Sequence, residues 1–231
     1  MKTIGMIGGM SWESSLEYYR IINETVKARL GGLHSAKSLL FSFDFEEIET
    51  LQMAGDWVKA TELMVQAARQ LERGGADFII ICTNTMHKMA EDVQAAISIP
   101  LLHIADATAT AIQAQNLHTI GLLGTNFTME EEFYKGRLEQ KFGLEVIVPE
   151  RPERQIVHDI IYDELCLGIT KADSRARYRQ IMADLTAAGA EGIILGCTEI
   201  GLLVNQEDSP VPLFDTTVIH AETAVTFALE A

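Results

Sequence analysis

Four short polar segments carry the side chains of this sequence that are suited to chemistry. Each follows an apolar run, precedes a helical pattern and is rich in glycine with hydroxyl, amide, thiol or carboxyl groups. They are Gly8-Gly9-Met10-Ser11, Cys82-Thr83-Asn84-Thr85, Gly124-Thr125-Asn126-Phe127-Thr128 and Gly196-Cys197-Thr198-Glu199. Backbone N–H groups exposed at the start of a helix suit an anion, most simply a carboxylate or a phosphate. Thr128 and Glu131 also have the spacing of a capping box, which predicts a helix from that point.

The segments between these loops alternate between strand and helix patterns. We expect strands at 3–7, 38–43, 78–82, 100–104, 119–123, 144–148 and 192–195, and helices at 14–30, 56–73, 87–97, 129–142 and 175–188. Such alternation is typical of parallel sheets with helices on both faces. Ligands of open parallel sheets bind at the carboxyl ends of the strands, where the four polar segments stand.

The second half of the chain repeats the first. Residues 3–8 match 119–124, residues 75–83 match 189–197 and residues 99–102 match 211–214, in one order and at nearly one offset. We therefore expect an α/β fold of two domains related by a pseudo-twofold axis, each a flavodoxin-like parallel sheet flanked by helices. The first domain is predicted to comprise 1–103 completed by 213–231 and the second 104–212, with the active site in the cleft between them.

The repeat pairs the polar segments position by position. Thr83 falls opposite Cys197, Asn84 opposite Thr198, and Thr85 opposite Glu199. Paired groups across one cleft fit a reaction that needs proton transfer on opposite faces of one carbon, of which racemisation is the simplest. Cys197 is a candidate base because a thiol pKa of about 8.5 is lowered at a helix N-terminus.

These motifs resemble the cofactor-independent aspartate/glutamate racemase superfamily, and within it the aspartate racemases. The residues that carry the resemblance are 5–11, Asn84-Thr85-Met86-His87 and Gly196-Cys197-Thr198-Glu199, and it extends over essentially the whole chain. The resemblance implies two α/β domains and two catalytic cysteines that act without pyridoxal phosphate. It also assigns the second cysteine, Cys197 here, to the face that deprotonates the L enantiomer.

The sequence departs from the superfamily at the first catalytic cysteine, where Thr83 stands. Cys82 comes one residue early, and because adjacent strand residues point to opposite faces, it is predicted to be a buried core thiol. The superfamily includes subgroups with threonine at this position, described as acting on L-aspartate and L-glutamate. It also includes single-thiol decarboxylases, which need only one proton donor.

We therefore expect an amino-acid racemase that acts on aspartate or glutamate, with Cys197 as the principal base and Thr83 as the opposing proton donor or relay. The threonine hydroxyls and loop N–H groups are expected to hold the α-carboxylate, and Glu199 or Asn84 the ammonium. The predicted substrate contacts are Met10, Gln52, Asn84, Thr85, Thr125, Thr128, Thr198 and Glu199. A decarboxylase or cis–trans isomerase of the same superfamily, or a non-catalytic carboxylate-binding protein, stays open.

Several other residues near the motifs have a less specific interpretation. Gln52 stands where aspartate racemases place a substrate contact, often an arginine. His87 is open between orienting the site and a structural role at a helix start. Cys166 is expected to be a buried cysteine on an apolar helix face, although relatives carry a substrate-facing lysine there. Met6 and Met86 are expected in the core.

Composition excludes several other classes of protein. A balance of 33 Asp and Glu against 18 Lys and Arg, a net charge of −15, disfavours a nucleic-acid partner. Apolar runs are too short for a membrane span or a signal peptide. Three cysteines make no disulfide framework and favour a reducing, cytoplasmic compartment. Without metal-ligand spacing or a dinucleotide fingerprint, neither a metal nor another cofactor is expected. The expected partner is a small amino acid, and a homodimer stays open.

Overall fold

The computed structural model describes residues 1–230 and divides into two α/β units. The first unit comprises Met1–Ile104 with the segment from His220 onward, and the second comprises Ala105–Ile219. Each unit holds one four-stranded sheet in which every strand pair is parallel. The predicted fold class, parallel sheets flanked by helices in two domains, is confirmed. The first domain was predicted to include 213–231. In the structure, residues 213–215 form a strand of the second sheet.

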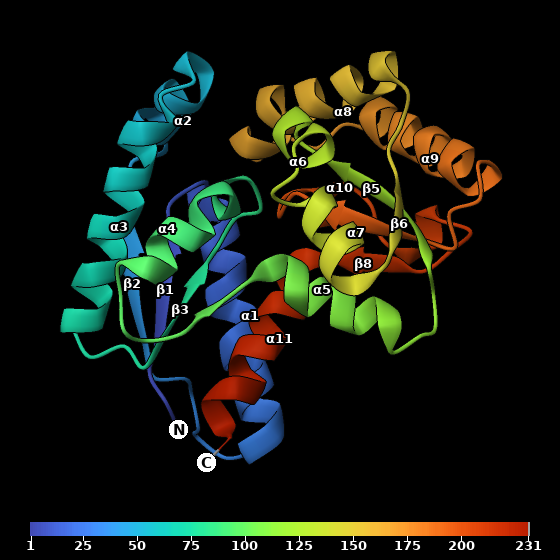
Figure 1. Ribbon diagram of the computed structural model, residues 1–231. Coiled ribbons are helices and arrows are strands. Elements are labelled where there is room, and N and C mark those ends of the chain that lie inside the picture. Colours follow the sequence, from blue (N-terminus) through green and yellow to red (C-terminus); the bar gives the residue numbers. More distant parts are fainter. Residues whose placement is uncertain (231) are drawn as a thin grey trace. The chain divides into compact units, whose positions relative to one another are not determined.

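The first sheet has the strand order β2-β1-β3-β4 (Figure 1). Its strands are β1 (Ile4–Gly8), β2 (Ser38–Ser42), β3 (Phe78–Ile81) and β4 (Leu101–Leu102). The helices are α1 (Trp12–Leu30), α2 (Phe45–Ala54), α3 (Trp57–Arg73), a 3₁₀ turn (Thr85–Met89), α4 (Ala90–Ala95) and, from His220 on, α11 (Thr216–Leu229).

Alternation along these strands builds two core layers in the first unit. Met6 and Ile80 face α1 and α11, in a cluster that also holds the buried Tyr18. Ile7 and Ile81 face the opposite way and pack with α2, α3 and α4. Side chains of a strand alternate between the two faces of its sheet. Where helices cover both faces, each strand is therefore a continuous apolar run in the sequence.

The second sheet has the equivalent order, β6-β5-β7-β8, so the repeat in the sequence is a repeat of strand topology. Its strands are β5 (Thr119–Gly124), β6 (Glu145–Ile147), β7 (Gly192–Gly196) and β8 (Leu213–Asp215). Its helices are α5 (Ile104–Gln113), α6 (Asn126–Glu130), α7 (Lys135–Phe142), α8 (Arg151–Asp163), α9 (Ala172–Ala187) and α10 (Ile200–Leu203).

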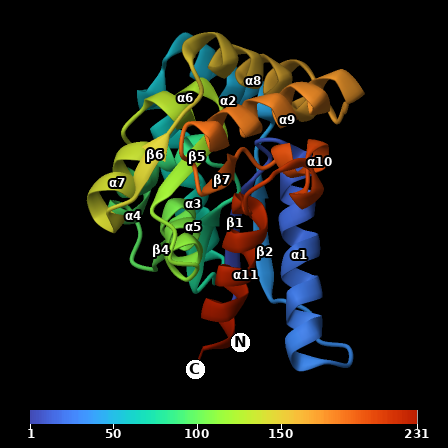
Figure 2. The ribbon, with the colours of Figure 1, turned by 90° about the vertical axis from the view of Figure 1, so that its right-hand side faces the viewer.

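Helices cover both faces of the second sheet as well. Asp106 of α5 forms ion pairs with Arg137 and Lys141 of α7, so these helices lie side by side. Figures 1 and 2 show α8 and α9 along the other face. Three short 3₁₀ turns complete the described chain, two of them in this unit at Leu165–Leu167 and Gln206–Asp208.

Two predicted helices are wrong in their extent. The helix expected at 129–142 is two helices, because α6 ends at Glu130 and α7 begins at Lys135. Thr125, not Thr128, caps α6: its hydroxyl accepts the N–H of Thr128. The helix expected at 87–97 is the 3₁₀ turn followed by the short α4. None of the helices in the described chain combines the length and apolar character that crossing a membrane requires.

Candidate active site

In the first unit, the loops after β1 and β3 lie side by side because their strands pair in register, with Ile7 opposite Ile81. The first turn of α1 ties them together. The Ser14 hydroxyl donates to the carbonyl of Cys82 at 3.1 Å, and the N–H of Gly9 donates to the Ser15 hydroxyl at 2.8 Å. Hydrogen bonds to a helix start therefore fix the backbone of both loops.

Thr83 and Cys82 occupy opposite environments at the end of β3. The Cys82 side chain is fully buried in the cluster beneath α1 and α11, and this burial raises the pKa of its thiol. Thr83 is half-buried. The prediction that Cys82 is a core thiol, based on strand alternation, is confirmed.

The His87 ring anchors the backbone of the loop that carries Thr83. Its Nε2 lies 3.2 Å from the N–H of Ile104, which can only donate, so Nε2 accepts and Nδ1 carries the ring proton. Nδ1–H then donates to the carbonyl oxygen of Thr83 at 2.7 Å. His87 is buried, at 2% exposure, so neither bond competes with water. Of the two roles left open for His87, these contacts favour the one that orients the loop.

The rings of two further histidines pack against the ring of His87. The ring of His103 lies 4.5 Å from that of His87, and the ring of His220 lies 5.8 Å from it. His220 Nε2 donates to the carbonyl of Leu102 at 3.0 Å, and its Nδ1 accepts the Tyr18 hydroxyl at 2.9 Å. Complete burial lowers the pKa of His220 to about 4, so this ring is neutral at neutral pH.

In the second unit, the loops after β5 and β7 are adjacent because Gly124 pairs with Gly196. Thr125 and Thr128 are both buried, and their hydroxyl oxygens lie 3.2 Å apart. The hydroxyl of Thr198 donates to Glu199 Oε2 at 2.8 Å. The two loops thus place hydroxyl groups at the carboxyl ends of the two central strands of the second sheet.

Cys197 directly follows β7 and is partly exposed. Its Sγ–H donates to Glu199 Oε2 at 2.9 Å, and Glu199 itself is 2% exposed. Removal from water and the nearby Glu199 carboxylate raise the pKa of the Cys197 thiol well above its ordinary value. The expected lowering of this pKa is wrong, because α10 begins only at Ile200 and the carboxylate lies closer. The resting thiol is therefore protonated.

Cys166 lies near the same thiol. It is part of the 3₁₀ turn Leu165–Leu167 and is partly exposed, not buried on a helix face as expected. It is close enough to contribute to the raised pKa of both Cys197 and the buried Tyr178. No motif in the sequence joins Cys166 to Cys197, and the signal for this neighbour was the resemblance, which places a substrate-facing lysine of relatives at position 166.

The remaining predicted contacts lie inside the first unit. Met10, Asn84 and Thr85 are at most 5% exposed, and Met10 belongs to the cluster under α3. Gln52, on α2, is 4% exposed and its amide donates to the Met86 sulfur at 3.1 Å. Met6 and Met86 are fully buried, as predicted. Within residues 1–230, no group of three or more His, Cys, Asp or Glu side chains is arranged to hold a metal ion.

Solved structures with this fold include amino-acid racemases. The chain is 35% identical to an aspartate racemase homologue from Pyrococcus horikoshii OT3, with a TM-score of 0.86 and all of both chains covered. It is 58% identical to a provisionally assigned Asp/Glu racemase from Yersinia pestis, with a TM-score of 0.93 and the same coverage. Glutamate racemase from Francisella tularensis shares the fold at 18% identity, a TM-score of 0.67, and 98% and 80% coverage.

The chain belongs to the Asp/Glu/hydantoin racemase family, whose model matches residues 7–224. It is also 26% identical over 165 residues to the broad specificity amino-acid racemase RacX of Bacillus subtilis, which covers 70% of this chain and 69% of RacX. The resemblance read from the motifs is confirmed, and the protein is an isomerase of the amino-acid racemase class.

Proposed function

We propose that this enzyme racemises a small acidic amino acid, aspartate or glutamate, with Cys197 as the principal base and Thr83 as the opposing proton donor or relay. The observation that carries the proposal is the Cys197 thiol donating to the buried Glu199 carboxylate, directly after the central strand β7. A buried carboxylate in contact with a thiol supplies a place for the thiol proton to go, and the thiolate is the reactive form.

The substrate's own charge would activate this pair. An amino acid carries an ammonium group, and a positive charge close to a thiol favours the thiolate. We assign the ammonium to Glu199 or Asn84. With its thiol proton transferred, Cys197 removes the α-proton of the L enantiomer, and the electron pair delocalises into the carboxylate. Thr83 then delivers a solvent-derived proton to the other face, which yields the D enantiomer.

The α-carboxylate is assigned to the loop N–H groups together with the hydroxyls of Thr85, Thr125 and Thr198. Thr128 serves this group indirectly, because its hydroxyl lies against that of Thr125. In the proposal, Met10 and Gln52 of the first unit line the part of the site that receives the substrate side chain. Gln52 offers an amide where related aspartate racemases often have an arginine, so it would bind a distal carboxylate by hydrogen bonding alone.

Further parts of the proposal concern cofactor, compartment and assembly. The reaction described uses only side chains of this protein, without pyridoxal phosphate. We place the protein in the reducing cytoplasm, where its three free cysteines would stay thiols. We include a homodimer in the proposal.

The test is turnover of single amino acids followed by chiral chromatography. L-aspartate and L-glutamate are incubated separately with the wild type, with Cys197→Ala and with the matched control Cys82→Ala. We expect D enantiomer from the wild type and from Cys82→Ala, and none from Cys197→Ala. Loss of all activity in a stably folded Cys82→Ala protein would contradict the assignment of roles.

The same reactions separate the alternatives. Release of CO₂ with a decarboxylated product would identify a decarboxylase, and a geometric isomer of an unsaturated acid would identify a cis–trans isomerase. Binding of the amino acid without turnover, unchanged by Cys197→Ser, would identify a carboxylate-binding protein. Each of these results would replace the racemase proposal.

A further inference from the structure

One face of α8 holds the loop that follows β5 in the second unit. Figures 1 and 2 show that α6, which continues this loop, lies against α8, and the two helices are in contact. His158 Nδ1 lies 3.3 Å from the backbone nitrogen of Asn126, the first residue of α6. A backbone N–H can only donate, so Nδ1 accepts and the ring proton is on Nε2. The bond therefore requires the neutral form of His158.

The contact satisfies a backbone group that α6 cannot satisfy by itself. The first N–H groups of a helix have no partner within the helix. Thr125 caps α6 through the N–H of Thr128, which leaves the N–H of Asn126 to another element. The carbonyl of Thr125 accepts the N–H of Met129 at 3.0 Å, so both polar groups of the peptide between Thr125 and Asn126 are hydrogen-bonded. His158 thus fixes the plane of the peptide that follows Thr125.

A second bond from α8 holds the side chain of Asn126. Gln155 Nε2 donates to the carboxylate of Asp159 at 2.7 Å. Because a carboxylate only accepts, this bond sets the orientation of the Gln155 amide, whose Oε1 then accepts from Asn126 Nδ2 at 3.2 Å. Gln155 and His158 are three residues apart and therefore share one face of α8. The same face thus holds both the backbone and the side chain of Asn126.

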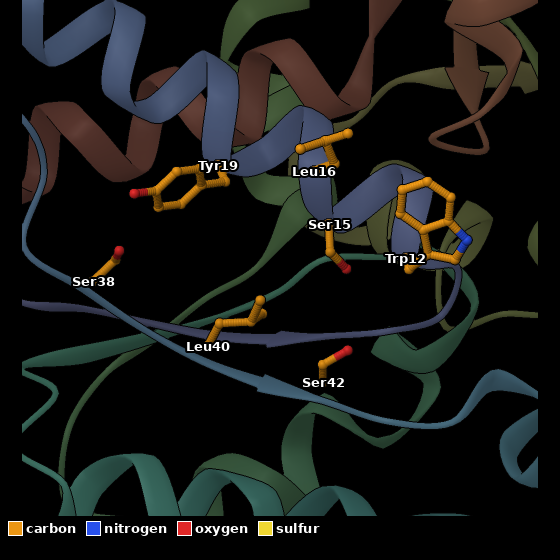
Figure 3. A pocket seen from close by; sticks show the side chains of 7 residues that line it. All are labelled: Trp12, Ser15, Leu16, Tyr19, Ser38, Leu40 and Ser42. Atoms are coloured by element: carbon orange, nitrogen blue, oxygen red, sulfur yellow. The ribbon is translucent and has the colours of Figure 1, made fainter.

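The corresponding loop of the first unit, after β1, is held by a group that does not titrate near neutral pH. The N–H of Gly9 donates to the hydroxyl of Ser15, which projects from α1 toward the strands in Figure 3. A serine hydroxyl can accept at any physiological pH, whereas a histidine ring has no acceptor once it binds a second proton. His158 therefore makes the contact of the loop after β5 dependent on pH.

Burial determines where His158 titrates. Its ring is partly buried and lies 4.8 Å from the ring of Tyr162 and 6.3 Å from that of Phe127. Removal from water disfavours the charged ring and lowers the pKa of His158 below the ordinary histidine value of about 6.5. Near neutral pH the ring is therefore uncharged and can accept from Asn126.

Carboxylates around the ring oppose this shift without reversing it. They are Asp159 and Asp163 of α8 itself and Glu130 of α6. Glu130 is also paired with Arg154, one turn before His158, at 2.9 Å. Where α9 and the turn Leu165–Leu167 contact α8, the ionisable groups include Arg177, Tyr178 and Cys166, and β5 contributes none.

We infer that His158 is a positioning residue for the loop after β5, and that its protonation weakens substrate binding as the pH falls. The inference rests on the proposed assignment of Thr125 to the α-carboxylate of the substrate. A protonated Nδ1 meets the N–H of Asn126 donor to donor, so the bond is lost and the peptide after Thr125 is released. The thiol of Cys197 follows another strand, β7, and does not depend on this contact. The effect therefore falls on KM more than on kcat.

The test is the KM of L-aspartate or L-glutamate between about pH 5.5 and pH 8 in the wild type and in His158→Asn. The side-chain oxygen of asparagine accepts at the δ position and does not titrate, so it stands in for the neutral ring at every pH. We expect the ratio of the wild-type KM to that of His158→Asn to rise roughly three- to tenfold toward low pH, the value of one hydrogen bond. The ratio of the kcat values should change little.

Two further variants complete the experiment. His158→Gln carries its amide one bond further out, at the ε position, and should have a raised KM at every pH. His118→Asn is the matched control, because His118 is exposed and lies at the amino end of β5, away from the loop. Its KM should follow that of the wild type. Identical KM profiles for the wild type and His158→Asn would overturn the inference, as would equal KM values for His158→Asn and His158→Gln.

Hydrogen exchange measured by mass spectrometry distinguishes failure of this inference from failure of the proposed function. It follows the protection of peptides that cover 124–130 in the protein without substrate, where turnover plays no part. After correction for intrinsic exchange rates, the wild type should lose protection there at low pH, and His158→Asn should not. This loss in a protein that turns over neither amino acid would refute the proposed function and support the positioning role. Equal protection in the two proteins at every pH would refute the positioning role.

Discussion

The buried His220 should make the first unit lose stability as the pH falls from 7 to 5. In the folded protein its pKa is lowered to about 4 because the ring is completely buried. In the unfolded chain the pKa of histidine is about 6.5. Between these two values the unfolded chain binds a proton that the folded protein excludes, so lower pH favours unfolding. The perturbation is the removal of this one titrating group by His220→Gln.

The expected magnitude follows from the two pKa values. A difference of about 2.5 pKa units limits the effect to about 3 kcal/mol, and between pH 7 and pH 5 the loss is about 2 kcal/mol. Gln at this position keeps a donor for the Leu102 carbonyl, but it removes the ring nitrogen that accepts the Tyr18 hydroxyl. The variant should therefore be less stable by about 1–3 kcal/mol at pH 7, with a flatter pH dependence.

The assay is urea unfolding at pH 7 and pH 5, followed by tryptophan fluorescence. Both tryptophans, Trp12 and Trp57, lie in the first unit, so the signal reports the unit that contains His220. Other groups that titrate in this range affect the wild type and the variant alike and cancel in the difference. His34→Gln is the control, since His34 is exposed and should leave the wild-type slope unchanged. Equal losses for wild type and His220→Gln between pH 7 and pH 5 would refute the reasoning.

Three further predictions concern the site. Thr83→Cys should raise kcat/KM equally in both directions, because a thiol is a better base than an alcohol near neutral pH; a large loss measured by chiral chromatography would show that the site requires the hydroxyl. His87→Gln keeps an acceptor for the Ile104 N–H but loses the donor to the Thr83 carbonyl, so kcat should fall roughly tenfold or more with little change in KM. His87→Asn has a donor at the δ position and should therefore retain most of the wild-type kcat. Steady-state kinetics of the two variants decide this, and equal losses would contradict an orienting role. Glu199→Gln should lower the pKa of Cys197, seen as alkylation of that thiol at lower pH by mass spectrometry, and an unchanged pH profile would show that the carboxylate does not control it.

The strands were predictable from sequence, but several helices were not. Each central strand is an apolar run that ends at a polar loop, and both sheets follow from that pattern. Helices α5 and α11 gave no helical period, since both are rich in threonine and alanine with few charged residues. Such sequences lack the polar face that marks a surface helix. Helix α8 has a proline in its first turn, which suits a helix start but reads as a break.

The site shows the same division. Strand alternation was sufficient to place Cys82 in the core and Thr83 partly in solvent, because that rule depends only on sequence position. The electrostatic environment of Cys197 was not predictable, since the pKa of a thiol depends on burial and on where a flexible Glu199 side chain lies. The contact of His87 with the Thr83 carbonyl likewise needed coordinates, because either ring nitrogen could carry the proton until Ile104 was seen to donate to Nε2.

The roles assigned to Cys197 and Thr83 make the two faces of the substrate unequal. Both enantiomers have the same free energy in water, so the equilibrium favours neither. The rate at which the α-proton exchanges with solvent, without inversion, can still differ between the two enantiomers. Cys197 can remove the α-proton of the L enantiomer, exchange it and return a deuteron to the same face. The corresponding exchange from the D enantiomer needs Thr83 as the base, and an alcohol is a poor one.

Hydrogen exchange in D₂O is therefore the most direct test. NMR follows loss of the α-proton from L and D substrate separately, while chiral chromatography follows inversion in the same samples. The proposed roles predict that deuterium accumulates in recovered L substrate faster than D enantiomer forms, and that D substrate exchanges with retention far more slowly. Equal rates of exchange with retention from the two enantiomers would contradict the assignment of Cys197 and Thr83.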